Sequence, residues 1–422
     1  MANDSSTGPS AGDATSARVT PPARAHEGRL PRTVLALSLV SLLTDVSSEM
    51  IYPLIPTFLA TTLGASALAV GAIEGTAEAV ASVLKYASGW WSDRLRRRKP
   101  LVVAGYLLAS VLRPLVGVAQ GVSQVFAIRV GDRIGKGIRT APRDALLADA
   151  VAPSQRGAAF GFHRAADHLG AVIGPLVAFV LMRWLGIPLR GVFLLAAIPA
   201  ALAMVVLIAM VREGDGARQA QEVRSGDVVV GGGAPGPPLG ARFGAFLAVL
   251  VVFTLGNSTD AFLLLRARSL GVETAMLPVL WAALHVVKAL ASAPAGALSD
   301  RVGRRRLIIG GWLVYALTYV GFAFAEGTWS AWLLFLVYGA YFGMTEGVEK
   351  ALVADLVPAA ERGRAFGLYH LAIALGALPA SLLFGAVWDA RGASAAFLMG
   401  ASLAALAALL LPLAVPRRIA PA

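Results

Sequence analysis

The sequence contains no cysteine, which excludes disulfide bonds, thiol catalysis and cysteine-based metal sites. Charged residues are scarce as well: they make up 15% of the chain, whereas soluble domains carry about 25%. Apolar residues reach 57% and come in long runs, such as Leu194–Met210 and Ala396–Val415. Runs of this length fit a chain surrounded by lipid better than a water-covered core.

Signatures of enzymes are missing too. The sequence has no nucleotide-binding loop, so ATP is not its direct energy source. Its methionines and its five histidines are scattered along the chain and form no ligand cluster. We therefore expect no catalytic residue, no cofactor and no metal site, and the sequence does not indicate an enzyme.

The net charge of +12 would suggest a nucleic-acid partner in a soluble protein. Here the basic residues gather in alternate short loops between the apolar runs. That distribution is typical of a membrane protein with these loops in the cytoplasm. We therefore expect a lipid bilayer and no nucleic acid as partner. The predicted location is a bacterial inner membrane, with several spans, both termini cytoplasmic, and a monomer as the default state.

Twelve segments are long and apolar enough to cross a bilayer core, which takes roughly 20 residues per helix. They are 33–60, 67–91, 100–119, 123–149, 157–182, 188–211, 243–266, 274–297, 306–325, 329–353, 364–387 and 393–415. The run Gly231–Pro238 is rich in glycine and proline, which is typical of a flexible linker. We expect a disordered cytoplasmic tail at 1–31, six-helix bundles at 32–211 and 243–416, a cytoplasmic linker at 212–242 and a short tail at 417–422.

One signature occurs twice, 207 residues apart, each time between two apolar segments. It reads Gly89-Trp-Trp-Ser-Asp93-Arg94 and then Gly296-Ala-Leu-Ser-Asp300-Arg301, with further arginines after each copy. Another pair of motifs, which begin at Asp149 and Asp355, lies 206 residues apart. The chain therefore consists of two similar halves, an arrangement typical of alternating-access carriers.

These motifs resemble those of the major facilitator superfamily. The second copy, with Gly303, fits the family's Gly-x-x-x-Asp-Arg-x-Gly-Arg-Arg loop pattern fully, whereas the first has Arg96 in place of the glycine. Arg133-Ile-Gly-Lys-Gly137 resembles a motif of the family's fourth helix. The stretch with Gly170, Gly174 and Pro175 resembles the fifth-helix motif of antiporters, without its last two glycines.

The resemblance covers about residues 32–415 and implies an all-α membrane protein with twelve transmembrane helices in two pseudo-symmetric six-helix bundles. It also implies that Gly89, Asp93, Arg94, Gly296, Asp300, Arg301 and Gly303 form gating hinges that close the cytoplasmic side. Gly170, Gly174 and Pro175 would allow close helix packing. The branch looks like a poorly characterised prokaryotic one, similar to exporters of drugs or metabolites.

Ionisable residues inside a bilayer cost about 2.5–3.5 kcal/mol each at its centre, so they should face water or one another. In the first half they share helical faces. These faces carry Asp45, Glu49 and Tyr52; Glu74, Glu78 and Lys85; Arg129, Asp132, Lys136, Arg139 and Arg143; and His163 with Asp167. We expect Asp45, Glu49, Glu74 and Glu78 to couple protons, and Arg133, Lys136, Arg139, Arg143, His163 and Asp167 to line a substrate cavity.

The second half has fewer polar residues. At an offset of 206, Lys136 corresponds to Phe342 and Asp167 to Ile373. The cavity residues expected here are Asn257, Asp260, Trp281, His285, Lys288 and Glu346. We infer that the first half supplies the ionic chemistry and the second half more of the aromatic and apolar contacts.

Structural alternatives exist for these residues. The basic face at 129–143 could be a buried network, and Arg139 and Arg143 could belong to a gate. The acids expected to couple protons could simply neutralise the charge of this basic face. Lys85 could reach the interface, and the two histidines and Trp281 could be packing residues.

The function indicated is a secondary transporter of a small organic molecule, driven by protons and more often exporting than importing. A carboxylate in the cavity would load and release a proton as the cavity changes sides. The basic face favours a substrate with an acidic or zwitterionic part. One alternative is symport uptake of an organic anion or nutrient; another, from a different class, is a sensor or assembly factor that no longer transports.

Overall fold

The structure is a computed structural model that describes residues 30–94, 98–151, 156–211, 240–358 and 361–415. The ordered elements of these residues are helices, and no strand occurs among them. Eleven segments are long and apolar enough to cross a membrane. A further long helix, at 122–149, is less apolar because charged side chains recur along it. The expected all-α membrane fold is confirmed.

The first half of the chain forms helices that reverse direction at short loops. They are α1 (Arg32–Ile51), η1 (Tyr52–Leu54), α2 (Ile55–Thr57), η2 (Phe58–Thr62), α3 (Ala67–Arg94), α4 (Lys99–Leu112), η3 (Arg113–Val118), α5 (Val122–Asp149), α6 (Arg156–Arg183), α7 (Leu189–Leu195) and α8 (Ala197–Met210).

The second half repeats this arrangement. Its elements are α10 (Ala241–Gly256), α11 (Ala261–Ser269), η5 (Thr274–Met276), α12 (Leu277–Val302), α13 (Arg304–Phe324), α14 (Gly327–Leu356), α15 (Arg362–Arg391) and α16 (Ala393–Ala414). The tail at 1–29, the linker core at 212–239 and the tail at 416–422 lie outside the described residues, so the proposed domain boundaries stay predictions.

The first span of each half is broken at corresponding positions. In the first half, regular α-helix ends after Ile51, because Pro53 and Pro56 have no N–H to donate to the helical ladder. In the second half, four non-helical residues from Asn257 to Asp260 separate α10 from α11. Tyr52 and Ser258, which lie at the two breaks, are 206 residues apart. The sequence analysis had treated 33–60 and 243–266 as continuous helices, which was wrong at these breaks.

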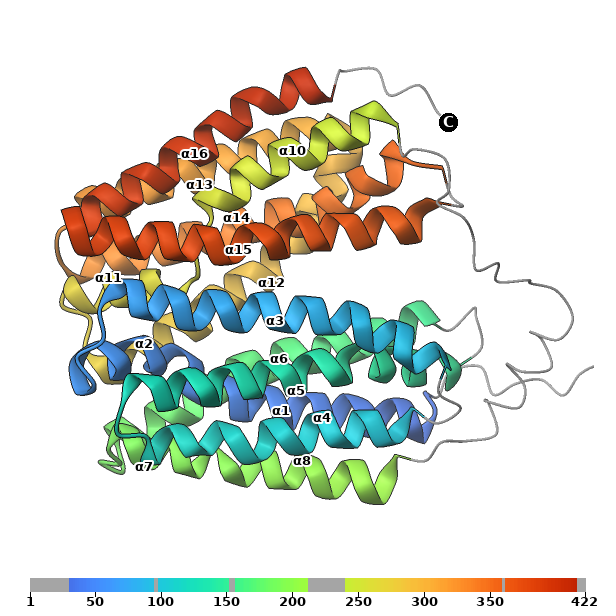
Figure 1. Cartoon of the computed structure of the whole chain (residues 1–422), viewed down its shortest axis with the longest axis vertical. Coiled ribbons are helices and arrows are strands. Elements are labelled where there is room, and N and C mark those ends of the chain that lie inside the picture. The colour runs from blue at the N-terminus through green and yellow to red at the C-terminus, as the bar shows by residue number, and fades with distance from the viewer. Residues whose placement is uncertain (1–29, 95–97, 152–155, 212–239, 359–360, 416–422) are drawn as a thin grey trace, which may run out of the picture. The chain divides into compact units, whose positions relative to one another are not determined.

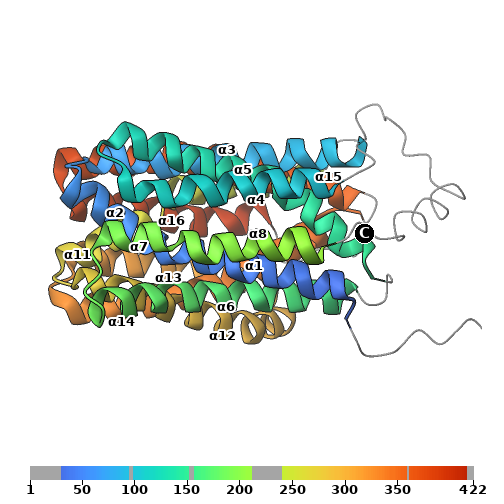
Figure 2. The same ribbon diagram turned by 90° about the horizontal axis from the view of Figure 1, so that it is seen from below.

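The helices of each half pack mainly on one another. In the first half, α1 packs on α6 and α8, and α5 packs on α3 and α4. In the second half, α12 packs on α14, α13 on α14 and α16, and α10 on α15 and α16. The halves meet along two seams, α3 with α15 and α6 with α12. Figure 1 shows the first seam, and Figure 2 shows α6 beside α12.

The helices have two ends that differ in their contacts. We call the hinge end the one where α3 and α12 finish, and the opposite end the one where α2 and α11 lie (Figure 1). Near the opposite end, α3 and α15 are in backbone contact: a Cβ on Gly71 would lie 2.3 Å from the carbonyl oxygen of Ser381. The carboxylate of Asp389 accepts hydrogen bonds from the backbone N–H groups of Ala67 (2.9 Å) and Leu68 (2.8 Å). A negative group from one half therefore caps a helix N-terminus of the other.

Candidate functional site

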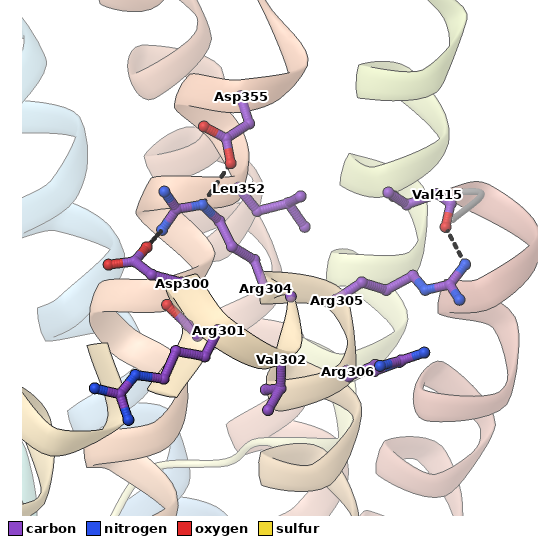
Figure 3. Close-up of a pocket in the computed structure, with 11 residues that line it drawn as sticks. Asp300, Arg301, Val302, Arg304, Arg305, Arg306, Leu352, Asp355 and Val415 are labelled. Atoms are coloured by element: carbon purple, nitrogen blue, oxygen red, sulfur yellow. Dashed lines mark hydrogen bonds and ion pairs between the residues drawn. The ribbon is translucent and has the colours of Figure 1, made fainter. Parts of the chain in front are cut away.

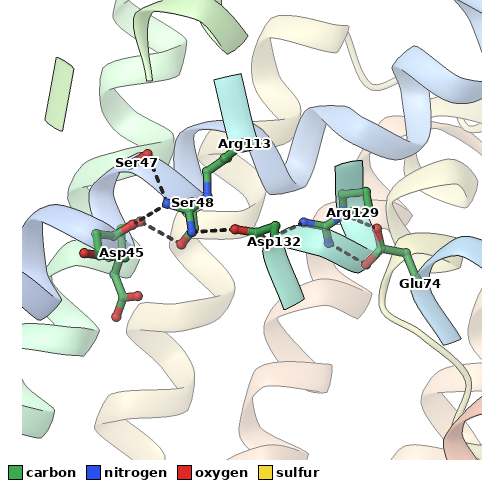
Figure 4. A network of polar contacts seen from close by, with 8 residues as sticks. Asp45, Ser47, Ser48, Glu74, Arg113, Arg129 and Asp132 are labelled. Atoms are coloured by element: carbon green, nitrogen blue, oxygen red, sulfur yellow. Dashed lines mark hydrogen bonds and ion pairs between the residues drawn. The ribbon is translucent and has the colours of Figure 1, made fainter. Parts of the chain in front are cut away.

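A chain of four buried charged residues crosses the first half (Figure 4). Arg129 binds Glu74 through two hydrogen bonds of 2.8 and 2.7 Å and lies 3.5 Å from Asp132. Arg113 in turn donates to Asp132 at 2.9 Å. All four residues are at most 5% exposed. Two acids and two bases balance to zero charge, which is how buried ions are tolerated.

The remaining donors of this network bind α1. Arg113 also donates to the carbonyl oxygen of Thr44 and to the hydroxyl of Ser47, each at 3.1 Å. The hydroxyl of Ser47 donates a hydrogen bond of 2.8 Å to the carbonyl oxygen of Ala196. The network therefore joins α1, α3, η3, α5 and the junction of α7 and α8. Glu74, expected to couple protons, is held here in an ion pair with two hydrogen bonds.

Asp45 and Glu49 lie on α1 against the glycines of α6. A Cβ on Gly170 would lie 2.8 Å from the Cβ of Asp45, and a Cβ on Gly174 would lie 3.1 Å from the Cβ of Glu49. Small residues therefore let the two helices approach closely at the level of both acids. Asp45 and Glu49 stay partly exposed to solvent. No ion pair of either acid occurs among the residues that the structure describes.

Glu49 contacts the other half of the protein. Its carboxylate accepts a hydrogen bond of 2.8 Å from the indole N–H of Trp281 on α12. The ring of Trp281 packs on Tyr52, with centroids 5.1 Å apart, and on His285 at 5.0 Å. The guanidinium group of Arg129 lies over the ring of Tyr52, 5.8 Å from its centroid. The cluster places an acid, aromatic rings and an imidazole at the interface of the halves.

Three charged residues of α3 and α5 remain accessible. Glu78 is exposed, while Arg133 and Lys136 are partly exposed. Lys136 interacts electrostatically with Glu78 and with Asp45. Within the described part of the chain, neither Arg133 nor Lys136 forms an ion pair, and Nε of Arg133 has no hydrogen-bond partner. These two cations can therefore receive an anionic group from outside the chain.

The other first-half residues expected in the cavity lie closer to the hinge end. Arg139 is 5% exposed and stacks over the ring of Tyr106 at 4.3 Å. Arg143 pairs with its neighbour Asp144 at 2.7 Å. His163 is buried, lies 3.4 Å from the hydroxyl of Ser38 and 3.8 Å from Asp167. The basic face of α5 thus divides between buried and accessible positions.

The second-half residues form two polar groups. At the break between α10 and α11, Asp260 accepts a hydrogen bond of 2.6 Å from the hydroxyl of Tyr338, and Asn257 lies 3.5 Å from the hydroxyl of Tyr341. On α12 and α14, Glu346 lies 3.2 Å from Lys288 and 3.6 Å from Lys350. Asp260 interacts electrostatically with Glu49 and Lys288. Asp260 of the second half therefore lies within electrostatic reach of Glu49 of the first half.

The second hinge copy connects three helices (Figure 3). Gly303 joins α12 to α13 with φ +94°, a conformation that favours glycine. Arg304 forms ion pairs with Asp300, at 3.4 Å, and with Asp355 at the end of α14. Arg98 and Asp149, each 206 residues earlier, form the corresponding ion pair in the first half. Gly296 and Arg301 lie in the same last turns of α12. The side chains of Asp93 and Arg94, the Gly89 position and Arg96 lie outside the described residues.

Sequence reasoning missed two residues that matter here. Arg113 stands in an otherwise apolar stretch, and a lone arginine beside Pro114 was the available signal. Asp389 fell beyond the end expected for its helix, at residue 387, so it was taken for a loop residue. Its partner, the start of α3, is more than 300 residues away, and no local pattern connects the two.

Comparisons with known proteins agree with this fold. The family model "Major Facilitator Superfamily" matches residues 37–284 and 243–422. An uncharacterized MFS-type transporter of Methanocaldococcus jannaschii is 32% identical over 392 residues, which cover 92% of this chain and 96% of that protein. The multidrug resistance protein MdtG of Serratia proteamaculans is 28% identical over 74% of this chain and 76% of its own length.

Solved structures show the same fold. The nucleoside transporter NupG superimposes with a TM-score of 0.75 at 13% identity, over 90% of this chain and 99% of its own. A bacterial homolog of the human lysosomal transporter Spinster, in an inward-facing conformation, gives a TM-score of 0.69 at 18% identity, over 92% and 96% of the two chains. With its helical halves, its repeated hinge and these matches, the chain belongs to the Major Facilitator Superfamily of secondary transporters.

Proposed function

We propose that the protein exports a small organic molecule in exchange for protons, by alternating access. The observation that carries this proposal is a set of accessible charges on α1, α3 and α5, namely Asp45, Glu49, Glu78, Arg133 and Lys136. Asp45, Glu49 and Glu78 lie in helices apolar enough to cross a bilayer, and Arg133 and Lys136 lie on α5, which packs on α3 and α4. Accessible charges at such positions mark a route for ions or substrate. The breaks in the first span of each half also favour a binding site near these charges, since interrupted helices in corresponding positions are typical of carrier binding sites.

In this proposal Asp45 and Glu49 bind the coupling proton. Neither forms an ion pair among the described residues, unlike Glu74 and Asp132, which are fixed in buried ion pairs. Glu49 also holds Trp281 of the other half. Protonation of Glu49 would remove the negative charge that strengthens this hydrogen bond. Proton uptake would therefore weaken one contact between the halves.

The proposed substrate carries an anionic group, alone or beside a cation. Arg133 and Lys136 would bind the anion, and the carboxylates Asp45 and Glu78 would bind a cation or balance the charge. The name of the MdtG relative, a multidrug resistance protein, supports export rather than uptake. The partial fifth-segment motif at Gly170 and Gly174 supports exchange.

We further propose that the hinge end faces the cytoplasm, because the arginines of both hinge copies lie there. The contacts of Asp389 with α3 and of Trp281 with Glu49 would then close the outer side. In the opposite conformation these contacts would break, and the hinge residues Asp300, Arg304 and Asp355 would help to close the cytoplasmic side.

The test is transport into proteoliposomes with a fluorescent zwitterionic fluoroquinolone as probe and a pH gradient imposed in each direction. We expect the probe to move against the direction of proton flow, and Asp45→Asn to abolish the gradient-driven part while the protein stays folded. Glu273→Gln, which changes an exposed acid in a loop, is the matched control and should behave as the wild type. Wild-type pH dependence in Asp45→Asn would remove the proton role of this acid.

The second candidate function is symport uptake of an organic anion, which the unpaired Arg133 and Lys136 also favour. In the same assay, probe moving in the same direction as the protons would establish it in place of exchange. No proton-linked movement of anionic, zwitterionic or cationic probes would favour a transport-inactive sensor.

A further inference from the structure

Besides Glu74 and Asp132, a further carboxylate is buried in the C-terminal half. Glu349 on α14 is 6% exposed. One of its oxygens accepts a hydrogen bond of 2.9 Å from the indole N–H of Trp312 on α13. The other accepts one of 2.9 Å from the hydroxyl of Tyr369 on α15. Three helices thus supply one acid and two neutral donors.

No lysine, arginine or histidine of the described residues forms an ion pair with Glu349. The nearby bases, Lys288 of α12 and Lys350 of α14, both bind Glu346 instead. Other charged and titratable groups around Glu349 are Glu346 and Lys350, which act on it electrostatically, Tyr341 and Tyr369, and His370, whose ring lies 5.1 Å from that of Tyr369. α13 presents the uncharged indole of Trp312. This differs from Glu74 and Asp132, each of which is bound by an arginine.

The first half has a basic residue at the position that corresponds to Glu349. At the offset of 206, Glu349 corresponds to Arg143, Trp312 to Tyr106 and Tyr369 to His163. Arg143 donates to Asp144 and Ser41. The carboxylate is therefore a feature of the second half alone, and the internal repeat does not require it there.

The two donors suit a group that changes its protonation state. Trp312 can only donate, so it holds its oxygen of Glu349 in both states. A tyrosine hydroxyl can donate or accept. It donates to the ionised carboxylate, and after a rotation of its O–H bond it accepts from the protonated acid. Both oxygens of Glu349 can therefore keep a hydrogen-bond partner when one proton is added to the carboxylate or removed from it.

We propose that Glu349 is a second proton-binding site of this transporter: its carboxylate binds one proton from water on one side of the membrane and releases it to water on the other side, so that it is ionised again before the next cycle. Glu346 is one helical turn away and 49% exposed on its side chain, and the exposed His370 lies beside Tyr369. In the proposal, these two groups pass the proton between Glu349 and water. This inference rests on the proposed proton coupling and adds a site to it.

Infrared difference spectroscopy of the purified full-length protein in lipid tests the site without any substrate. Lowering the pH from about 9 to about 4 should produce the C=O band of a protonated carboxyl group that Glu349→Gln lacks and Asp45→Asn retains. In proteoliposomes, Glu349→Gln should lose gradient-driven movement of the fluoroquinolone probe. A glutamine preserves the shape of the side chain, and circular dichroism at each pH checks the fold.

Identical difference spectra for the wild type and Glu349→Gln would overturn the inference. So would wild-type transport in Glu349→Gln. If Glu349→Gln does not fold, Tyr369→Phe is the second variant: it keeps the acid and removes the hydroxyl that can both donate and accept. The C=O band should then titrate at a different pH. An unchanged titration would also overturn the inference. Failure of the proposed function is seen separately, as an absence of proton-linked transport in the wild type itself.

Discussion

The two halves share a fold but have different interiors. In the first half, the buried chain consists of Glu74, Arg129, Asp132 and Arg113. At the offset of 206 the second half has Leu280, Phe335, Tyr338 and Tyr319 in their places, and all four are buried. An ionic network in one half thus corresponds to an apolar and aromatic core in the other.

The aromatic core of the second half is continuous. Phe253 stacks on Trp312 with ring centroids 4.5 Å apart, and Tyr315 stacks on Tyr319 at 4.1 Å. Tyr338 joins this group and donates to Asp260 at the helix break. The sequence analysis assigned aromatic contacts in this half to the substrate; most of these rings are instead buried among one another. The same fold can therefore be stabilised by balanced ions or by stacked rings.

The largest expected effect comes from breaking the ionic network. Arg129→Met removes the cation between Glu74 and Asp132, so Glu74 is left buried without a partner, at a cost of about 3–5 kcal/mol. The double variant Glu74→Leu with Arg129→Met makes this position resemble the second half, and most of the lost stability should return. Thermal unfolding in detergent measures both.

Lys350→Met is the matched control for that experiment. It removes a base from a partly exposed pair with Glu346, whose side chains are 39% and 49% exposed, and the expected cost is about 0–1 kcal/mol. Equal stability of Arg129→Met and Lys350→Met would show that the ionic network does not hold the first half together.

The fold could be predicted from sequence because its signals are local. The length of the apolar runs gives the spans, and the repeated Asp300 and Asp355 motifs give the two halves. The broken spans at Tyr52 and Asn257 were missed, although Pro53 and Pro56 marked the first of them. At the second, α10 ends at Gly256 and Asn257 follows it.

The site could be predicted only in outline. Helical spacing places Arg129, Asp132 and Lys136 on one face of α5, as expected, but it cannot tell which of them meets a buried acid and which meets water. That depends on the neighbouring helix at each turn: Glu74 on α3 reaches Arg129, whereas Lys136 lies one to two turns further on and stays accessible. The contacts between halves, such as that of Glu49 with Trp281, have no local signal at all.

A smaller effect on stability is expected from changes in the two seams, which differ from each other as the interiors of the two halves do. Asp389 caps α3 in one seam, whereas the residue 206 positions earlier, at the end of α6, is the exposed Arg183. Asp389→Asn keeps one acceptor oxygen and loses the negative charge at the helix N-terminus, so the closed seam should weaken by about 1–2 kcal/mol. Arg183→Gln, the matched control, should leave the equilibrium unchanged.

The chain's lack of cysteine makes this measurable. Thr62→Cys and Arg391→Cys place two spin labels at exposed positions on either side of the seam. The distribution of distances between the labels gives the fraction of molecules in which α3 and α15 have separated. Asp389→Asn should increase that fraction about 5- to 30-fold. Distributions that coincide for Asp389→Asn and its parent would mean that the cap does not hold the seam.

The smallest effect on stability, and a clear one on rate, is expected at the hinge. The side chain of Asp300 is 66% exposed, so its 3.4 Å ion pair with Arg304 contributes about 0–1 kcal/mol. Asp300→Asn should therefore leave the unfolding temperature and probe binding nearly unchanged, yet slow turnover, because the contacts that close the hinge end are weakened. Asp93→Asn, in the copy that has Arg96 in place of the turn glycine, compares the two halves directly. A slower turnover in Asp300→Asn alone would assign gating to the copy with Gly303, whereas equal rates in both variants and the wild type would place gating elsewhere.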